Sequence, residues 1–333
     1  MPRIRSIATV LPPHRILQPD AKAAYRTIFG EGARLSIFDH SGVDARYFVH
    51  PLDYHLDGRS FAERNRDWLA GGLDLAGRAI RDALERAQLA PADIDHLFFV
   101  TTTGLATPSL DALLCHRMGF RPDVTRHPYF GIGCAGGAGA LRRAADALRG
   151  RPSQRALVLS VELCSQTFRK QDDSVVNLVG AALFGDGAAA LVIEGDAVAS
   201  AGPEIVDSAG ELFPDSQRLM GWEFENDGLK LVLSAEIPQV IRDTALPAVR
   251  RFLRGRPVTH WVLHPGGTKV LEAYGRSEAE IAPARDSLRE HGNLSSAAVL
   301  FILARIAPKP GDTALVAAVG PGFGIEMTYL RWP

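Results

Sequence analysis

The chain has 333 residues, of which 46% are hydrophobic and 23% charged, and its formal net charge is −1. This composition indicates a soluble globular protein with a large core, and the balanced charge offers no basic surface for nucleic acid or for an anionic membrane. No apolar stretch is long enough to span a membrane, and the apolar run near the N-terminus is too short for a signal peptide. We therefore expect neither membrane insertion nor a nucleic-acid partner.

The cysteines indicate the cellular compartment. Cys115, Cys134 and Cys164 are an odd number, and none belongs to a CxxC pair. This pattern argues against both a disulfide framework and a zinc site, and it favours a reducing environment. We expect a cytoplasmic protein without a metal centre.

The first half of the chain alternates helical and apolar segments. Its continuous apolar runs are typical of strands that are buried on both faces. The predicted elements, in chain order, are a helix at about 62–88, a strand at 96–100 (HLFFV), a helix and a second apolar run that lead to Gly133, a helix after Cys134, a strand at 156–161 (ALVLSV), a turn at 184–187 (FGDG) and a strand at 188–193 (AAALVI).

The second half repeats this order. Its predicted elements are a helix at 235–254, a strand at 260–264 (HWVLH), a helix opened by Asn293, a strand at 314–319 (ALVAAV), a turn at 320–324 (GPGFG) and a last strand at 325–330 (IEMTYL). Cys134 precedes ALVLSV by 22 residues, and Asn293 precedes ALVAAV by 21.

These parallels predict a duplicated α/β fold, with two sheets in helical layers and halves that meet face to face. The halves are residues 1–196 and 197–333. Chance similarity between two generic α/β segments is the alternative explanation.

Cys134 lies in GIGCAGGAGAL, at the first turn of a predicted helix. The dipole and the free N–H groups of a helix N-terminus favour the thiolate, which is the reactive form of cysteine. The adjacent glycines permit a sharp turn and a close approach of substrate to the backbone. A small core cysteine beside helix-packing glycines is the alternative. A hydrolase nucleophile elbow is disfavoured, because Ile132 occupies a position that such an elbow gives to glycine.

His264 ends the apolar run HWVLH and precedes a Pro-Gly-Gly turn. A ring in this place can face a cleft, where it stabilises a thiolate or donates a hydrogen bond to an oxyanion. Considered alone, His264 is more often a structural histidine, and Asn293 in HGNLSSAA is more often a helix N-cap. The duplication changes this balance, because it places Cys134 and Asn293 at equivalent helix starts, with His264 at the end of a strand between them.

Five segments together resemble one enzyme family. They are GCAGG around Cys134, HPGG at 264–267, GNLSSA at 292–297, ALFGDGAAAL at 182–191 and GPGFGIE at 320–326. Their order and spacing are similar to those of the type III polyketide synthases, the chalcone-synthase-like family of the thiolase-like superfamily. The resemblance extends from about Thr101 to the C-terminus.

The resemblance implies a thiolase-like fold of duplicated α-β-α-β-α layers, a homodimer, and an acyltransferase activity. The implied reaction is the iterative decarboxylative condensation of malonyl-CoA onto an acyl-CoA starter. It implies no cofactor, since the coenzyme A thioesters are substrates.

The resemblance also assigns roles to individual residues. Cys134 matches the acyl-carrying nucleophile, while His264 and Asn293 match the residues that bind the thioester carbonyl of malonyl-CoA and stabilise its enolate. Phe184 matches a phenylalanine between the coenzyme A tunnel and the cavity; a core aromatic is the alternative. The other matching positions are Thr102, Thr103, Thr107, Cys164, Thr167, Leu231 and Ser295 for the substrate pocket, and Gly266, Gly267 and Lys269 for the tunnel. Thr107 matches a residue that reaches across the dimer interface in the family.

Two positions depart from the plant members of the family. Leu231 stands where they carry a second gatekeeper phenylalanine, and the basic cluster that grips the coenzyme A phosphates has no counterpart at 33–46, where only Arg34 and Arg46 are basic. Lys269 is a candidate substitute, with a solvated surface lysine as the alternative. The segments VELCS and HPGGTK resemble the bacterial branch, several members of which use fatty acyl starters and release alkylpyrones or alkylresorcinols. We expect a starter of this kind.

Two other functions are compatible with the same residues. A β-ketoacyl-ACP synthase III-like enzyme shares the Cys-His-Asn set but performs one condensation and accepts a carrier protein; the HPGG and GPGFG segments favour the polyketide synthase. A catalytically inactive thiolase-like protein that binds acyl-CoA is disfavoured, because all three chemical residues are present. The starter, the number of extensions and the mode of ring closure depend on cavity shape and have no readable motif.

Overall fold

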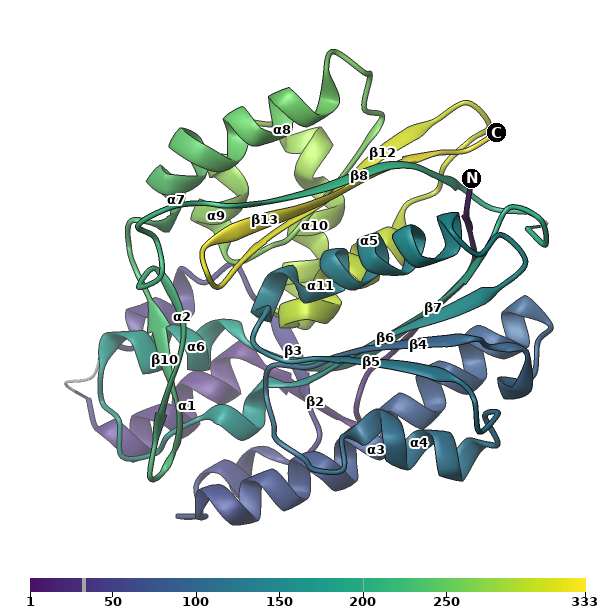
Figure 1. Ribbon diagram of the computed structural model, residues 1–333. Helices are drawn as coiled ribbons and strands as arrows, with labels where there is room; N and C mark the ends of the chain where they lie inside the picture. Colours follow the sequence, from purple (N-terminus) through teal and green to yellow (C-terminus); the bar gives the residue numbers. More distant parts are fainter. Residues whose placement is uncertain (32–33, 200) are drawn as a thin grey trace.

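A computed structural model describes residues 1–31, 34–199 and 201–333. In this part of the chain the largest sheet has nine strands in the order β11-β12-β13-β8-β1-β7-β6-β4-β5 (Figure 1). The strands of this sheet are β1 (Arg3–Val10), β4 (His96–Val100), β5 (Thr125–Tyr129), β6 (Arg155–Leu163), β7 (Asp186–Glu194), β8 (Glu204–Leu212), β11 (His260–Leu263), β12 (Thr313–Gly320) and β13 (Gly324–Arg331).

The α-helices are α1 (Gln18–Phe29), α2 (Ser36–Asp39), α3 (Phe61–Ala87), α4 (Leu110–Met118), α5 (Gly136–Arg149), α6 (Val175–Leu183), α7 (Ile237–Val240), α8 (Leu246–Leu253), α9 (Thr268–Ala273), α10 (Glu278–His291) and α11 (Ala298–Arg305). The shorter turns are η1 (Leu52–His55), η2 (Pro91–Asp93), η3 (Gly133–Ala135), η4 (Cys164–Thr167), the π-helical η5 (Ile241–Ala245) and η6 (Ser295–Ala297). The long predicted helix corresponds to α3. It begins at a capping box in which Ser60 and Glu63 bond each other's backbone N–H groups.

The two halves of the large sheet have the same strand arrangement. In the first half β4 pairs parallel to β6, β6 antiparallel to β7, and β7 antiparallel to β1. In the second half β11, β12, β13 and β8 pair in the same senses. The halves join where Arg3 of β1 pairs with Glu204 of β8. The predicted duplication is confirmed, but the expectation of two separate sheets is wrong, because the pairing of β1 with β8 joins the two half-sheets into one. The boundary that we drew at 196/197 lies between β7 and β8.

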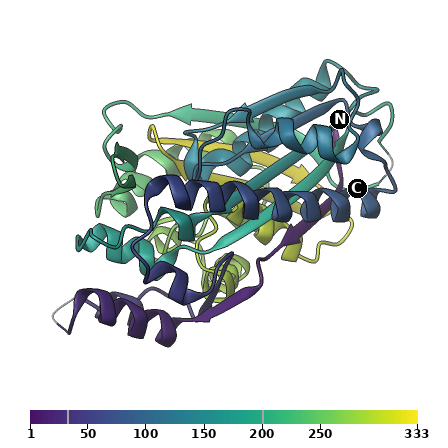
Figure 2. The same cartoon turned by 90° about the horizontal axis from the view of Figure 1, so that it is seen from below.

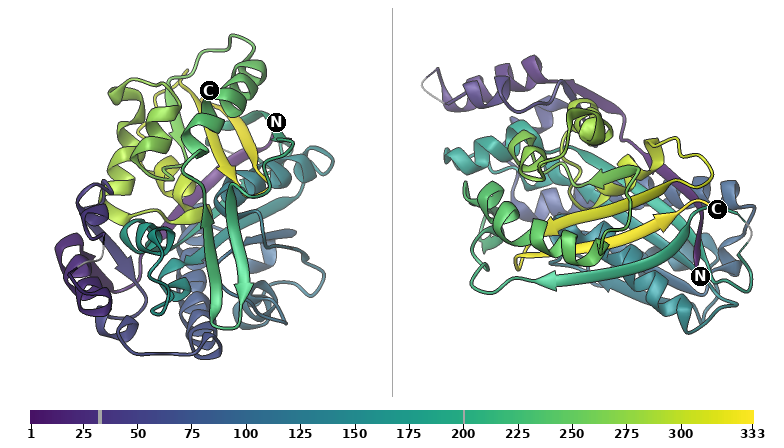
Figure 3. Two further views of the ribbon diagram at one scale, coloured as in Figure 1. Left: turned by 90° about the vertical axis from the view of Figure 1, so that its left-hand side faces the viewer. Right: turned by 90° about the horizontal axis from the view of Figure 1, so that it is seen from above.

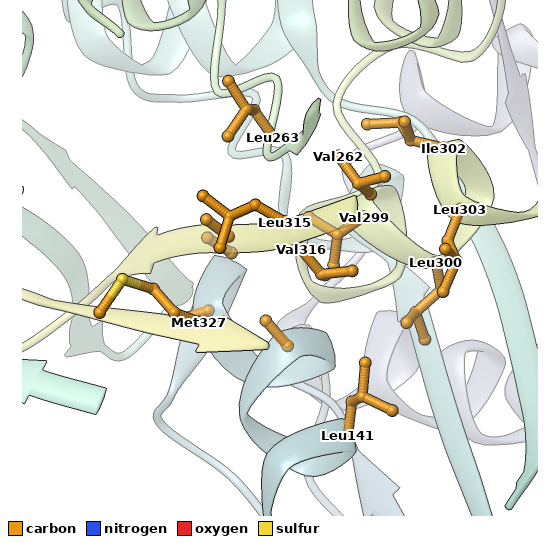
Figure 4. Packing of buried hydrophobic residues seen from close by; sticks show 14 of the residues in the cluster. Leu141, Val262, Leu263, Val299, Leu300, Ile302, Leu303, Leu315, Val316 and Met327 are labelled. Carbon is orange, nitrogen blue, oxygen red and sulfur yellow. The ribbon is translucent and has the colours of Figure 1, made fainter. Parts of the chain in front are cut away.

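Helices form the layers around and between the half-sheets. The long helix α3 covers one face of the first half and extends across the molecule (Figure 2). The other face is covered by α5, which contacts β4 and β6 on one side and β12 and β13 of the second half on the other. Figure 4 shows this central layer, where Leu141 of α5 and Leu300 of α11 pack near Val316 and Met327. The layers therefore bring the starts of α5 and α11 together in the middle of the protein.

Glycine permits the close contact between these two helix starts. A Cβ atom on Gly137 of α5 would lie 2.1 Å from the backbone oxygen of Ser296, which directly precedes Ala297 and α11. A Cβ on Gly133 would lie 2.5 Å from the Pro321 ring, and Gly133 has a φ of +55°. Only glycine fits both positions without movement of the backbone or the ring.

Two small sheets lie outside the large one. One pairs β2 (His14–Leu17) with β3 (Ala45–Phe48), and the other is a hairpin of β9 (Met220–Glu225) and β10 (Gly228–Leu233). The left view of Figure 3 shows this hairpin as a separate ribbon of two green strands. The hairpin is important for the site below, because it forms one wall of the main cavity.

The structure differs from the predicted elements in two places. The segment 184–187 is not a free turn: Phe184 ends α6 and forms a parallel bridge with Asn293, and β7 already begins at Asp186. The strand before Cys134 is not apolar, because β5 (TRHPY) lies at the edge of the sheet and is partly exposed. Among the described residues, no helix has the length and apolarity that a bilayer crossing needs.

Candidate active site

A cavity of about 470 Å³ lies between the two halves of the chain. The first half contributes the end of β4, the η3 and η4 turns and α6, while the second half contributes the β9–β10 hairpin, the loop between β11 and α9, and the segment before η6. Cys134, His264 and Asn293 all line this cavity. The structure thus brings the three predicted catalytic side chains into one site.

Cys134 lies in the η3 turn, immediately before α5, and is partly exposed to the cavity. Its Sγ atom is 3.7 Å from the Ser295 Oγ atom, which comes from the other half of the chain. Ser295 has a φ of +48°, an uncommon conformation for a residue other than glycine. Ser295 was predicted as a pocket residue, and the structure places its hydroxyl beside the candidate nucleophile.

His264 follows the last residue of β11 and is 1% exposed. Its backbone N–H donates to the Ala317 oxygen at 3.0 Å, which continues the pairing of β11 with β12. Its buried Nδ1 atom has no hydrogen-bond partner among the described residues. The imidazole is therefore free to interact with a ligand.

Asn293 is 2% exposed and is fixed from three directions. Its N–H donates to Leu183 O at 2.7 Å, its carbonyl accepts from Gly185 N–H at 3.1 Å, and its side-chain oxygen accepts from Ser295 N–H at 2.8 Å. The amide oxygen is thus occupied, and the amide NH₂ group remains available as a donor. The same bonds connect Asn293 to Phe184, the predicted gatekeeper, through the α6 end.

Burial dominates the electrostatics of the site. Desolvation raises the pKa of the Cys134 thiol to about 12, although the hydrogen bond with Ser295 opposes this shift. Burial lowers the pKa of His264 to about 4. Burial therefore favours the neutral form of both groups, and for the Cys134 thiol it opposes the effect expected of a helix N-terminus.

One buried carboxyl group near Cys134 was not predicted from the sequence. Glu162 of β6 is fully buried and accepts hydrogen bonds from Thr102 N–H at 3.0 Å, from Thr103 Oγ1 at 2.9 Å and from Ser296 Oγ. Burial raises its pKa to about 7 despite these bonds. A glutamate inside the apolar run ALVLSVEL was the available signal. Its network connects the end of β4 to the η6 turn of the other half.

Most predicted pocket positions line the main cavity. They are Thr102, Thr103, Cys164, Phe184, Leu231 and Ser295, together with Gly266, Gly267 and Lys269 of the predicted tunnel. Trp222 and Met220 also line it and were missed: the apolar alternation of MGWEFE indicates a strand with one apolar face, but it does not say which surface that face covers.

Three predicted positions have a different setting. Thr167 lies on a second, smaller cavity of about 30 Å³, and its hydroxyl donates to the Cys164 carbonyl at 2.8 Å. Thr107 is exposed and does not line the cavity of its own chain. Arg46 is completely buried, where it donates to the carbonyl oxygens of Ala181 and Phe184, so it cannot reach a solvent-exposed phosphate. Arg34 is exposed.

The second cavity shares a wall with the first. Cys164, Phe184, Trp222 and Leu231 line both spaces. The smaller space continues toward Tyr25, Phe48 and Phe168. These shared side chains therefore bound the main cavity at the end that lies toward α1.

Comparison with known families agrees with this geometry. The sequence profile of the N-terminal domain of chalcone and stilbene synthases matches residues 59–197, and the profile of their C-terminal domain matches residues 204–331. The two matches together span most of the chain. They support the polyketide synthase over the single-condensation alternative.

Individual relatives are similar over nearly the full length. The chain is 40% identical to a 1,3,6,8-tetrahydroxynaphthalene synthase of Streptomyces peucetius subsp. caesius, with 99% of this chain and 93% of that protein covered. It is 34% identical to a putative chalcone synthase of Bacillus subtilis strain 168, with 99% and 98% covered. The crystal structure of a 1,3,6,8-tetrahydroxynaphthalene synthase from Streptomyces coelicolor A3(2), a bacterial type III polyketide synthase, superposes with a TM-score of 0.94 at 26% identity over 99% of both chains. The chain therefore belongs to the chalcone and stilbene synthase family and is a type III polyketide synthase, an acyltransferase that condenses malonyl-CoA iteratively.

Proposed function

We propose that Cys134 carries the starter and the growing chain as a thioester, while His264 and Asn293 bind the carbonyl oxygen of the malonyl thioester. The observation that carries this proposal is the cavity that the three side chains share. The nucleophile comes from one half of the fold, and the two hydrogen-bonding side chains come from the other. A thioester that enters the cavity meets both.

In the loading step, the Cys134 sulfur attacks the acyl carbonyl. The new carbon–sulfur bond replaces the bond to coenzyme A, and the thiol proton passes to the departing sulfur. We propose His264 as the carrier of this proton, since its neutral imidazole lines the same cavity and has an Nδ1 atom without a partner among the described residues. One thioester replaces another, so the step needs neither ATP nor a cofactor.

In the extension step, the malonyl carboxylate leaves as CO₂ and its bonding electrons form an enolate. The Asn293 amide and the His264 ring donate hydrogen bonds to the enolate oxygen. The α-carbon then attacks the Cys134 thioester, which lengthens the chain on coenzyme A and frees the thiol for the next transfer. Asparagine suits this position, because it donates hydrogen bonds without a charge that titrates.

We further propose a fatty acyl-CoA starter. The support for it is the apolar lining of the main cavity, which includes Val175, Val179, Leu183, Leu231, Leu233 and Ile237. Each buried methylene group contributes about 0.8 kcal/mol, so two added carbons improve selectivity up to about tenfold where space allows. Leu231 leaves room that a phenylalanine would fill.

A second candidate has its own support. The relative that is 40% identical is a tetrahydroxynaphthalene synthase. The ten ring carbons of a naphthalene correspond to five two-carbon units, so malonyl-CoA can supply all of them without another starter. A protein with this activity forms an aromatic product from malonyl-CoA alone.

One experiment tests the roles and distinguishes the starters. The protein is incubated with malonyl-CoA alone and with acyl-CoA starters from C2 to C14, and CO₂ and products are followed by mass spectrometry. We expect several CO₂ molecules per starter, kcat/KM that rises from about C6 to at least C10, and an acyl adduct that peptide mapping finds on Cys134. A flat chain-length profile, or efficient synthesis from malonyl-CoA alone, contradicts the fatty starter; an adduct on another residue contradicts the catalytic assignment.

Lys269 is our proposed contact for the coenzyme A phosphates. It is exposed, lines the cavity beside Gly266 and Gly267, and has no ion-pair partner among the described residues. The described part of 34–46 supplies no alternative pair of cations, since Arg46 is buried. The two glycines leave the backbone accessible to the pantetheine arm.

We also propose a homodimer. The support is the exposed edge strand β5 at one end of the large sheet, because unpaired strand edges are templates for association. The exposed Phe130 directly follows β5 in the chain. Sedimentation is expected to give twice the 36.0 kDa mass of the chain. A stable, active monomer contradicts this assignment.

The compartment that we propose is the cytoplasm. All three cysteines lie in the described part of the chain and are free. A nucleophilic thiol needs a reducing environment to stay unoxidised.

A further inference from the structure

The β9–β10 hairpin forms one wall of the main cavity. Trp222 and Leu231 are cross-strand partners in the hairpin, and both line the cavity. The hairpin strands pair with each other and with no strand of the large sheet. A two-stranded hairpin is at best marginally stable by itself, so contacts outside the hairpin must fix the position of this wall.

Several such contacts are at the tip of the hairpin, where Arg64 of α3 donates to the Asp227 carbonyl oxygen at 2.5 Å and Arg169 bonds the side chains. Arg169, in the loop after η4, donates from Nε to both carboxylate oxygens of Asp227 at 3.1 and 3.0 Å, and from Nη2 to Asp227 and to Glu225, both at 2.6 Å. Its third nitrogen, Nη1, donates to Asp172 at 3.1 Å. The Arg169 side chain is 9% exposed, so water competes little for these bonds.

Both sides of this contact are connected to the site. On the loop side, the Asn177 amide of α6 donates to the Arg169 and Asp172 carbonyl oxygens at 2.8 and 2.6 Å, and η4 of the same loop contains Cys164. On the hairpin side, the Trp222 indole donates to the Thr102 hydroxyl at 3.2 Å. The tip lies three residue pairs from the Trp222–Leu231 pair, or roughly 10 Å along the strands.

We propose that Arg169 is a positioning residue that sets the width of the chain-elongation cavity by holding the hairpin wall against the η4 loop. It touches no substrate in this proposal, which rests on the proposed function of the cavity. The partner carboxylates of Glu225 and Asp227 are 39% and 42% exposed, so water can solvate them when Arg169 is replaced, and Arg169 acts mainly on wall position and less on global stability. A wall that moves outward admits a longer chain before release.

The test compares Arg169→Met with Arg169→Lys, Asp227→Asn and the control Arg251→Met. The control removes an exposed pair between Arg251 of α8 and Glu211 of β8, neither of which lines the cavity. We expect Arg169→Met to change the ratio of longer to shorter ketide products at least threefold and to raise KM for the starter more than it lowers kcat. Asp227→Asn is expected to shift the ratio in the same direction, Arg169→Lys less, and the control not at all.

Two further readouts separate a positioning role from a structural one. High salt is expected to move the wild-type product ratio toward that of Arg169→Met, while the ratio of the variant stays unchanged. If Arg169→Met fails to fold, the product ratio of Asp227→Asn tests the proposal instead, because asparagine is nearly isosteric with aspartate. An unchanged product ratio in Arg169→Met and Asp227→Asn, with only lower total activity, overturns this inference but leaves the role of Cys134 intact. Product synthesis without acylation of Cys134 overturns the proposed function instead.

Discussion

The two helix starts at the centre of the fold are built alike but carry different chemistry. In the first half the η3 turn leads into α5 and then to β6, and in the second half the η6 turn leads into α11 and then to β12. The first start presents Cys134, a group that titrates and forms covalent bonds. The second is preceded by Asn293, which is held by three hydrogen bonds and does not titrate.

This difference shows how a duplicated fold divides the chemistry of one reaction. Gly137 allows the two starts to approach, and the Cys134 and Ser295 side chains are 3.7 Å apart. The first half then supplies the reactive sulfur, and the second supplies a fixed donor for the oxygen of the same substrate.

The largest effect is expected from Cys134→Ala. Removal of the sulfur leaves no acyl acceptor, so product formation falls by at least about 10³-fold. Malonyl-CoA decarboxylation continues slowly, because His264 and Asn293 still bind the carbonyl oxygen. Product formation and CO₂ release are measured in parallel, with Cys115→Ala as a control whose thiol lies outside the cavity. Wild-type product yield from Cys134→Ala would rule out the proposed mechanism.

Asn293→Asp tests the other helix start. The carboxylate still accepts the Ser295 N–H bond, but it has lost the amide donor and places a negative charge beside the enolate. We expect kcat to fall about 10²- to 10³-fold, while a starter still acylates Cys134. Intact-protein mass spectrometry follows the acylation, and CO₂ release follows the extension. Equal loss of both steps would contradict the division between the two starts.

Gly137→Ala tests the contact between the starts. A Cβ there would lie 2.1 Å from the Ser296 oxygen, so the backbone must shift. Overpacking of this kind costs about 1–3 kcal/mol, which exceeds the gain in helix propensity. We expect lower stability in chemical unfolding and lower activity. The control Gly150→Ala adds a Cβ with 3.8 Å to its nearest neighbour and is expected to change the free energy of unfolding by at most about 0.5 kcal/mol.

Much of this arrangement follows from the sequence for identifiable reasons. The runs at 96–100, 156–161 and 314–319 are strands buried on both faces, and continuous apolar sequence is their signature. His264 ends a predicted strand before a glycine turn, and Cys134 directly follows a glycine turn. Both settings are typical of side chains that face a cleft. That Asn293 and Cys134 occupy equivalent helix starts followed from the duplication, and not from any property of asparagine itself.

The positions that were not predicted depend on tertiary contacts or, for Thr167, on a turn without strand alternation. Thr167 lies in the η4 turn, where no strand alternation fixes the side-chain direction, and it faces the smaller cavity. Trp222 reaches the main cavity because the hairpin folds over the site, which only tertiary contacts such as the Asp227–Arg169 pair determine. Glu162 was hidden because its partners, Thr103 and Ser296, are distant in sequence.

The smallest effect concerns Glu162, which bonds Ser296 across the two halves. Burial raises its pKa from 4.5 to about 7, so between these values the folded protein binds more protons than the unfolded chain. The free energy of unfolding therefore falls as pH rises through this window. Glu162→Gln removes this contribution, and we expect a shallower decline in urea unfolding between pH 5 and pH 8.

The decline is not expected to vanish in Glu162→Gln. Burial also raises the pKa of Asp186 to about 7, so this second carboxyl group contributes a slope of the same sign. The control is Glu236→Gln, which changes an exposed glutamate outside the Glu162 network and should keep the wild-type slope. Identical slopes in wild type and Glu162→Gln would mean that Glu162 is ionised throughout this range. The bond to Ser296 would then join the helix starts through a charged group rather than a titrating one.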